Sequence, residues 1–310
     1  MGPELTQYPR DLIGYAAHPP QISWPANARV AVQFVLNYEE GAENSVLHGD
    51  AASEIFLSEI IGATAFQGRR HLSMESIYEY GSRAGVWRIL DLFRSRQVPL
   101  TVFGVAMAMA RNPGVVEQML KDGHEIASHG YRWINYDGFT RADERAHMEQ
   151  AIDMHQALTG EKPFGWYTGR TSEHTRSLVN SFDHFEYDAD DYSDDLPFWS
   201  RLETHRPHLV VPYTLDTNDM RFATAQGFHT AEQFETYLKD AFDVLYAEGA
   251  TCPKMLSVGL HCRLIGRPAR FAGLQRFLDY VLAHDAVWVC RRIDLARHFA
   301  TQVPYPGDVR

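Results

Sequence analysis

The chain has 310 residues, of which 45% are hydrophobic and 22% charged, so it can bury the core of one large α/β domain or of two small ones. Its 29 basic and 40 acidic side chains give a formal net charge of −11, which argues against binding to nucleic acid or to an anionic membrane. The three cysteines show no CxxC spacing, and neither a membrane-length apolar run nor a secretory leader pattern is visible. We therefore expect a cytoplasmic protein without a disulfide framework.

An arm rich in proline and tyrosine, residues 1–27, precedes the first apolar run and is expected to lie over the body of the molecule. Short apolar runs then alternate with amphipathic segments. The runs predict buried strands over residues 29–37, 100–105 and 124–129. The amphipathic segments predict helices over residues 74–96, 115–121 and 144–158, with Gly123 and Gly160 following the last two.

The second half of the chain continues the same alternation. It predicts strands over residues 208–213, 254–261 and 286–290, and helices over residues 231–247, 268–284 and 293–299. Alternating strands and helices are typical of a parallel sheet, and no change of composition marks a linker, so we expect one catalytic domain over residues 1–310. A barrel is favoured over an open dinucleotide-binding sheet because no GxGxxG follows the first strand.

Polar side chains follow several predicted strands, at the carboxyl ends where parallel α/β folds place their active sites. Glu39 and Glu40 leave the first strand, where mutual repulsion and partial burial would raise the pKa of one of them, as suits a general base. Such a pair is more often a solvated acidic turn, but its position after a buried strand favours function. His129 and His261 end later strands. Either histidine alone is more often structural, whereas both together with a carboxylate indicate an acid–base set.

Further polar and aromatic residues near the strand ends are candidates for binding a substrate. Arginine can hold carbonyl groups, although a surface ion pair is its commoner role. Tryptophan can form a wall against a flat ring, although core packing fits it equally well. The candidates are Trp133, Trp166, Arg170, Asn218, Asp219 and Arg263.

Three features together resemble the polysaccharide deacetylase (NodB-homology) family: an acidic pair followed by glycine, HEIxSHG over residues 124–130, and a late strand ending in Leu-His. The resemblance implies a distorted (β/α) barrel of about seven parallel strands. It also implies a catalytic carboxylate, a general-acid histidine, and a divalent metal held by the second carboxylate and two histidines. His129 matches the first of these two histidines, but Trp133 stands at the place of the second, and an indole cannot ligate a metal. We therefore expect no metal and no other cofactor.

Longer motifs resemble a subgroup of that family, the metal-independent allantoinases of bacterial purine breakdown (the PuuE type). These motifs are NYEEG (37–41), SHGYRWI (128–134), GWYTGR (165–170), DTNDMRF (216–222) and LHCRLIGRPAR (260–270). The resemblance implies a cytoplasmic homo-oligomer, a tetramer, that hydrolyses the hydantoin ring of a small ureide, allantoin, to allantoate. Arg170 and Asn218 would then hold the ring carbonyls and the ureido group.

The same resemblance implies roles for the strand-end residues. Glu39 is the expected general base and His261 the expected general acid, while Glu40 and His129 are expected to orient water and substrate. Two alternatives stay open. One is a carbohydrate N-deacetylase of the same family, which the missing metal histidine disfavours. The other is a barrel that binds a ureide without turning it over, which the retained Glu39/His261 pair disfavours.

Overall fold

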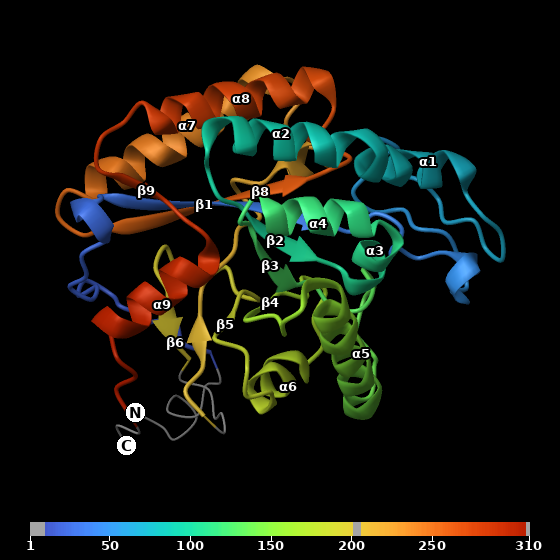
Figure 1. The fold of residues 1–310 in the computed structure, drawn as a ribbon, viewed down its shortest axis with the longest axis horizontal. Coiled ribbons are helices and arrows are strands. Elements are labelled where there is room, and N and C mark those ends of the chain that lie inside the picture. Colours follow the sequence, from blue (N-terminus) through green and yellow to red (C-terminus); the bar gives the residue numbers. More distant parts are fainter. Residues whose placement is uncertain (1–9, 201–205, 308–310) are drawn as a thin grey trace.

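A computed structural model describes residues 10–200 and 206–307 of the chain. One curled sheet runs through these residues, and helices cover its outer side (Figure 1). The strands follow the order β6-β7-β5-β4-β3-β2-β1-β8, with β9 beside the start of β1. Their bounds are Val30–Tyr38 (β1), Thr101–Gly104 (β2), Glu125–Ser128 (β3), Gly165–Trp166 (β4), Tyr187–Asp188 (β5), Phe198–Trp199 (β6), Leu209–Val210 (β7), Lys254–His261 (β8) and Val287–Val289 (β9).

The strand pairings are parallel except for the antiparallel pair of β6 and β7. After β7 the chain returns to β8, where Asn218 pairs with Gly259, so the curled sheet approaches closure. This arrangement confirms the predicted α/β fold with a distorted barrel. Without β6, the nine-stranded sheet has eight parallel strands, one more than the about seven that the family resemblance implies.

The helices alternate with the strands, as the sequence predicts. α1 and α2 form one helical stretch through a π-helical turn at Gly81–Gly85, where a single helix over 74–96 was expected. No helix in residues 10–200 and 206–307 combines the length and apolarity needed to cross a membrane. The bounds are Leu72–Tyr80 (α1), Val86–Arg96 (α2), Ala106–Arg111 (α3), Pro113–Lys121 (α4), Arg141–Thr159 (α5), Thr175–Ser181 (α6), Ala231–Glu248 (α7), Pro268–Leu282 (α8) and Arg292–Gln302 (α9).

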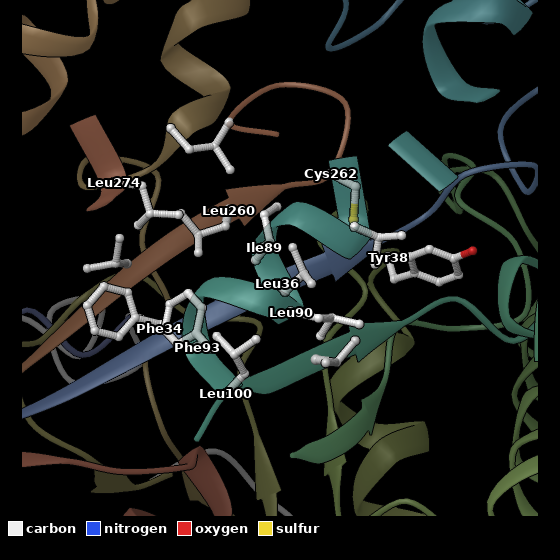
Figure 2. Packing of buried hydrophobic residues seen from close by; sticks show 14 of the residues in the cluster. Phe34, Leu36, Tyr38, Ile89, Leu90, Phe93, Leu100, Leu260, Cys262 and Leu274 are labelled. Carbon is white, nitrogen blue, oxygen red and sulfur yellow. The ribbon is translucent and has the colours of Figure 1, made fainter. Parts of the chain in front are cut away.

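β1 pairs with β2, β8 and β9, and its side chains alternate between two environments. Phe34 and Leu36 pack against residues of α2 and α8 in the core shown in Figure 2. Val35, between them, belongs to the second core cluster, inside the barrel. Continued past the strand end, the same alternation sends Glu39 inward and Glu40 toward the helices.

The described part of the predicted arm begins at Arg10, and residues 1–9 lie outside the described residues. The hydroxyl of Tyr15 donates to the carbonyl of Pro197 at 2.6 Å. Trp24 is buried, and its indole N–H donates to the carbonyl of Lys254 at 2.8 Å. The arm therefore contacts the chain just before β6 and at the start of β8.

Candidate active site

Glu39 follows β1 on the inward-facing side and is the point at which three other side chains meet. Its Oε1 lies 3.2 Å from Nε2 of His129 and 3.6 Å from Nε2 of His261. Its Oε2 lies 2.8 Å from Nη2 of Arg263. The structure thus brings together the carboxylate and the two histidines that follow separate strands, and we call Glu39, His129 and His261 the central cluster.

The two adjacent glutamates have opposite pKa shifts. Burial disfavours a charge on Glu39, but the positive charges of Arg263 and His261, with a hydrogen bond from His129, outweigh burial. The pKa of Glu39 therefore lies well below its ordinary value. Burial, with a smaller contribution from the charge of Glu39, raises the pKa of Glu40 above its ordinary value. The sequence predicts one raised pKa in the pair, and it belongs to Glu40 rather than to the expected base.

His261 ends β8, and Asp219 fixes its ring from behind. Nδ1 of His261 donates to Oδ1 of Asp219 at 2.6 Å, and the backbone N–H of His261 donates to Oδ2 at 2.7 Å. With Nδ1 occupied, Nε2 is the nitrogen that faces Glu39. Burial alone would lower the pKa of His261, but the charges of Asp219 and Glu39 raise it above its ordinary value. The ring therefore holds its proton more tightly than a free histidine does.

His129 follows β3 and is held on both ring nitrogens. Nδ1 donates to the carbonyl of Tyr167 at 3.0 Å, and Nε2 lies 3.2 Å from Oε1 of Glu39. A carbonyl only accepts, so Nδ1 carries a hydrogen. The carbonyl of Tyr167 and the carboxylate of Glu39 therefore fix the orientation of the ring from both sides.

Glu40 points to the helix side of β1, away from the central cluster. Its Oε2 accepts from the backbone N–H of Glu39 at 3.0 Å, and its Oε1 lies 3.5 Å from Nη1 of Arg263. Gly81 gives it room, because a Cβ there would lie 2.3 Å from Oε1. Within the described residues no contact joins Glu40 to His129. Their predicted role in orienting water and substrate stays a prediction.

The residues present do not fit the divalent metal that the family resemblance implies. Arg263 already sets a positive charge against both glutamates, at 2.8 Å from Glu39 and 3.5 Å from Glu40. Trp133 contributes an indole ring, which has no lone pair to offer. In the part of the chain that the structure describes, no three His, Cys, Asp or Glu side chains converge on a point where a metal could bind. We therefore route no chemical step through a metal.

Arg170 and Trp133 form the more open side of the site. The guanidinium carbon of Arg170 lies 3.9 Å from the ring centroid of Trp133, and Trp133 stacks on Phe56 at 5.9 Å. Arg170 also lies 3.6 Å from Oε2 of Glu54. The side chain of Arg170 is 17% exposed, and Phe56 is 44% exposed. Arg170 is therefore the predicted substrate-binding residue that remains accessible beside the buried Trp133.

The other predicted substrate-binding residues face protein groups instead. Trp166 is buried on the outer side of the sheet, in the cluster formed with α5 and α6. Asn218 caps the short helix that begins at Asp219, and its amide donates to the carbonyl of Thr214 at 3.0 Å. Asp219 lies behind His261, as described above, and Arg263 is fully buried between the glutamates. The role of these four side chains in binding a substrate stays a prediction.

Some residues that the sequence does not single out also shape the site. The ring of Tyr167 packs against that of His129 at 5.0 Å and edge-on against Tyr213 at 4.8 Å. The carbonyl of Leu57 accepts from Nε of Arg263 at 2.8 Å, and Leu57 has a φ of +46°, in the left-handed region. These residues act through a carbonyl or a packed ring, a contribution that residue type alone does not indicate.

A cavity of about 900 Å³ opens between α7, β8 and the segment after β7. Its lining includes Tyr213 but no member of the central cluster. Glu39, His129 and His261 are at most 4% exposed. The central cluster therefore lies below the surface and apart from this cavity.

Comparison with known sequences finds relatives over almost the whole chain. A family model described as polysaccharide deacetylase matches residues 72–189. A Schizosaccharomyces pombe protein, whose name places it among the polysaccharide deacetylases, is 43% identical over 96% of this chain and 98% of its own length. The peptidoglycan deacetylase of Helicobacter pylori is 22% identical over 68% of this chain and 82% of its own length.

Two similar crystal structures match more closely still. A protein of Pseudomonas aeruginosa, described as a probable polysaccharide deacetylase, is 63% identical with a TM-score of 0.95 over 96% of this chain and 100% of its own. PuuE allantoinase is 61% identical with a TM-score of 0.95 over 96% of this chain and 99% of its own. The names of these two neighbours point to different substrates.

Proposed function

The chain belongs to the polysaccharide deacetylase family, and we propose that it opens the cyclic amide of allantoin by hydrolysis to give allantoate, without a required metal. The observation that carries the substrate is the likeness to PuuE allantoinase along 96% of the chain. The site agrees with it, because Arg263 and Trp133 stand where a metal-dependent deacetylase needs an open set of metal ligands.

Opening a cyclic amide needs an activated water, a stabilised oxyanion and a proton for the leaving nitrogen. In the proposed reaction Glu39 takes a proton from water while the water oxygen attacks the ring carbonyl. Nε2 of His261 then gives its proton to the ring nitrogen as the C–N bond breaks. The carboxylic acid formed releases its remaining proton to the solvent, and the proton held by Glu39 passes to Nε2 of His261, so the products are a carboxylate and an N–H group and the enzyme returns to its starting state.

The low pKa of Glu39 makes it a weak base in the resting enzyme, but it also keeps the carboxylate ionised over the whole working pH range. The contact of His129 with Oε1 holds the carboxylate of Glu39 in position while it takes the proton from water. Asp219 is proposed as a positioning residue that holds the ring of His261 and its proton, and not as a ligand of the substrate. Glu40 is proposed as a support of Arg263, and Arg170 with Trp133 as the side that receives the ring carbonyls.

A carbohydrate N-deacetylase is the second candidate, because the Schizosaccharomyces pombe relative and the Pseudomonas aeruginosa structure carry deacetylase names. The same base and acid could hydrolyse an acetamide. The proposed small-ureide substrate, one catalytic domain, a homotetramer and a cytoplasmic location remain predictions from the sequence.

One assay separates the candidates. Purified, chelator-treated protein is incubated with allantoin and, separately, with an N-acetylated chitin oligomer, and allantoate or acetate is measured. We expect allantoate to form and no acetate. Acetate formation with no allantoate would transfer the proposal to the deacetylase, and binding of allantoin with no product would indicate a barrel that binds a ureide without turnover.

A further inference from the structure

We propose that Arg263 is a positioning residue: a built-in cation, fixed between Glu39 and Glu40, that compensates both buried carboxylates and sets the orientation of Glu39. The inference rests on the proposed function for its role in turnover. Its structural part, charge compensation inside the fold, stands on contacts alone.

Each nitrogen of the Arg263 guanidinium faces an acceptor. Nε donates to the carbonyl of Leu57 at 2.8 Å. Nη1 lies 3.5 Å from Oε1 of Glu40, and Nη2 lies 2.8 Å from Oε2 of Glu39. The planar group thus spans the two adjacent carboxylates as a fork, which a lysine ammonium cannot reproduce.

Aromatic rings close the space around the guanidinium. Its carbon lies 4.2 Å from the ring centroid of Tyr78 and 5.0 Å from that of Trp133. The residue is 0% exposed. Leu57 adopts a left-handed φ of +46°, which is costly for a branched side chain, and this conformation aims its carbonyl at Nε of Arg263. The surrounding chain therefore fixes the position of the charge and does not merely tolerate it.

The contact between Arg263 and Glu39 leaves Oε2 of Glu39 able to accept a hydrogen bond. Nη2 and Oε2 lie within ion-pair distance, yet neither has a well-aligned hydrogen-bond partner among the described residues. The attraction is therefore Coulombic, and Oε2 keeps lone pairs that can accept from the attacking water. Removing the cation would leave the two neighbouring buried carboxylates without the positive charge that they share, and one of them would have to take up a proton. The charged and titratable groups that face Arg263 are Glu39 and Glu40 after β1, Glu43 in the following loop, Tyr78 on α1, and His261 and Cys262 at the end of β8.

Arg263→Met tests the proposal, with Arg267→Met as the matched control. Arg267 belongs to the same loop, lies 3.2 Å from Glu59 and stacks over Tyr80 at 3.7 Å, but its side chain is 33% exposed. We expect the Arg263 variant to lose turnover of allantoin by ~10²-fold or more, with the acidic limb of its pH–rate profile moved to higher pH. The control variant should behave like the wild type. A wild-type pH profile and rate in Arg263→Met would overturn the proposal.

A second readout needs no substrate. Melting temperatures are measured from pH 5 to pH 8 for the wild type, Arg263→Met, Glu40→Gln and the double variant. Without Arg263 the folded carboxylates have a pKa above their unfolded value, so stability is present at low pH and lost as pH rises through the folded pKa. We expect Arg263→Met to melt several degrees lower at pH 8 than at pH 5, and the added Glu40→Gln to restore much of the loss. Purely additive effects of the two substitutions would overturn the proposal.

These outcomes keep the two proposals apart. Strong coupling in the melting experiment with no allantoin turnover in the wild type supports the role of Arg263 and rejects the proposed substrate. Turnover of allantoin by the wild type, with no coupling between the two substitutions in the melting experiment, supports the proposed substrate and rejects the role of Arg263. Should Arg263→Met fail to fold, folding of the double variant supports charge compensation. If neither folds, the triple variant that adds Glu39→Gln decides, because its folding supports charge compensation and its failure to fold rejects it.

Discussion

At the scale of single residues, the carboxylate of Glu39 is the group on which the central cluster converges. Glu39→Gln keeps nearly the same shape but cannot accept a proton from water. We expect turnover to fall by ~10²–10⁴-fold, the usual effect of losing a positioned general base. The fold should survive, because Glu40 remains as a partner for Arg263. Steady-state kinetics with a melting curve of the same preparation check both points, and a rate within a few-fold of the wild type would remove Glu39 from the role of base.

His261 is buried and hydrogen-bonded, so its replacement separates a catalytic role from a structural one. We expect His261→Ala to lower kcat and kcat/KM together by ~10²-fold or more, because a proton donor acts in the transition state and not in substrate binding. The alternative is a purely structural role, in which His261 is a core histidine hydrogen-bonded to Asp219. Replacing His261 would then lower only the stability of the fold. A normal kcat in the folded fraction with a large drop in melting temperature would exclude His261, and the donor would then have to be sought at His129.

Asp219 gives a prediction about pH. Burial lowers the pKa of His261, and the charge of Asp219 is the largest effect that raises it again. In Asp219→Asn the largest effect that raises the pKa is lost, so the basic limb of the kcat profile should move to lower pH.

The same variant changes stability in a defined direction. In the wild type the raised pKa of His261 contributes stability that is fully present below the unfolded pKa of about 6.5 and lost as pH rises through the folded pKa. Asp219→Asn should therefore lose stability mainly at low pH. Melting curves and rates measured across pH 5 to 9 check this, and an unmoved basic limb would show that another group donates the proton.

At the scale of secondary-structure elements, the strand ends could be read from the sequence because a buried apolar run followed by polar residues is a local pattern. That logic placed Glu39, His129 and His261 at one end of the barrel. It could not fix which side of the sheet a residue faces where a strand is short. β4 has only two residues, Gly165–Trp166, so no alternation shows that Trp166 points outward while Tyr167 points inward.

Local sequence patterns also could not predict the short helices and strands or the burial of charged side chains. α3, α6, β5 and β6 have between two and seven residues, too few to show a period, and the sequence predicts none of them. Asp219 reaches His261 because a short helix starts at that residue after the chain returns to β8. Arg263 is buried because Leu57 and Tyr78, about 200 residues earlier, surround it.

The π-helical turn between α1 and α2 makes a prediction of its own. Gly81 is helical, so Gly81→Ala gains helix propensity of ~1 kcal/mol, but its Cβ would lie 2.3 Å from Oε1 of the immobile Glu40. We expect the clash to prevail, with a net loss of ~1–3 kcal/mol and reduced turnover as Glu40 and Arg263 shift.

Gly114→Ala is the matched control for this substitution. Gly114 lies in the first turn of α4, where a Cβ would meet only a side-chain oxygen of Asn112 at 4.0 Å. This control should be neutral or slightly stabilising. Chemical denaturation gives the free energy of unfolding of both variants. Equal values for Gly81→Ala and Gly114→Ala would mean that Glu40 moves aside at little cost and that the prediction is wrong.

At the scale of the whole molecule, a pair of carboxylates at the end of the first strand can be compensated in two ways. A bound divalent ion is one, and it requires three or more protein ligands. In this chain the pair is instead compensated from within the fold, by Arg263 on the loop after β8. The net charge of −11 attracts free cations to the molecule, so overall charge does not explain why an internal cation takes the place of a bound metal.

This contrast yields the last prediction, that exhaustive chelation leaves both rate and stability unchanged. A metal bound to the folded state adds stability by mass action, so its removal would lower the melting temperature as well as the rate. With a guanidinium already set against both carboxylates, an added Zn²⁺ or Mn²⁺ would meet repulsion instead of an open ligand set. The measurements are allantoin turnover and melting temperature before and after dialysis against a chelator, with metal content determined on the same samples. Loss of activity that Zn²⁺ or Mn²⁺ restores would overturn the metal-free mechanism, and it would require Arg263 to move away from Glu39 and Glu40 when the ion binds.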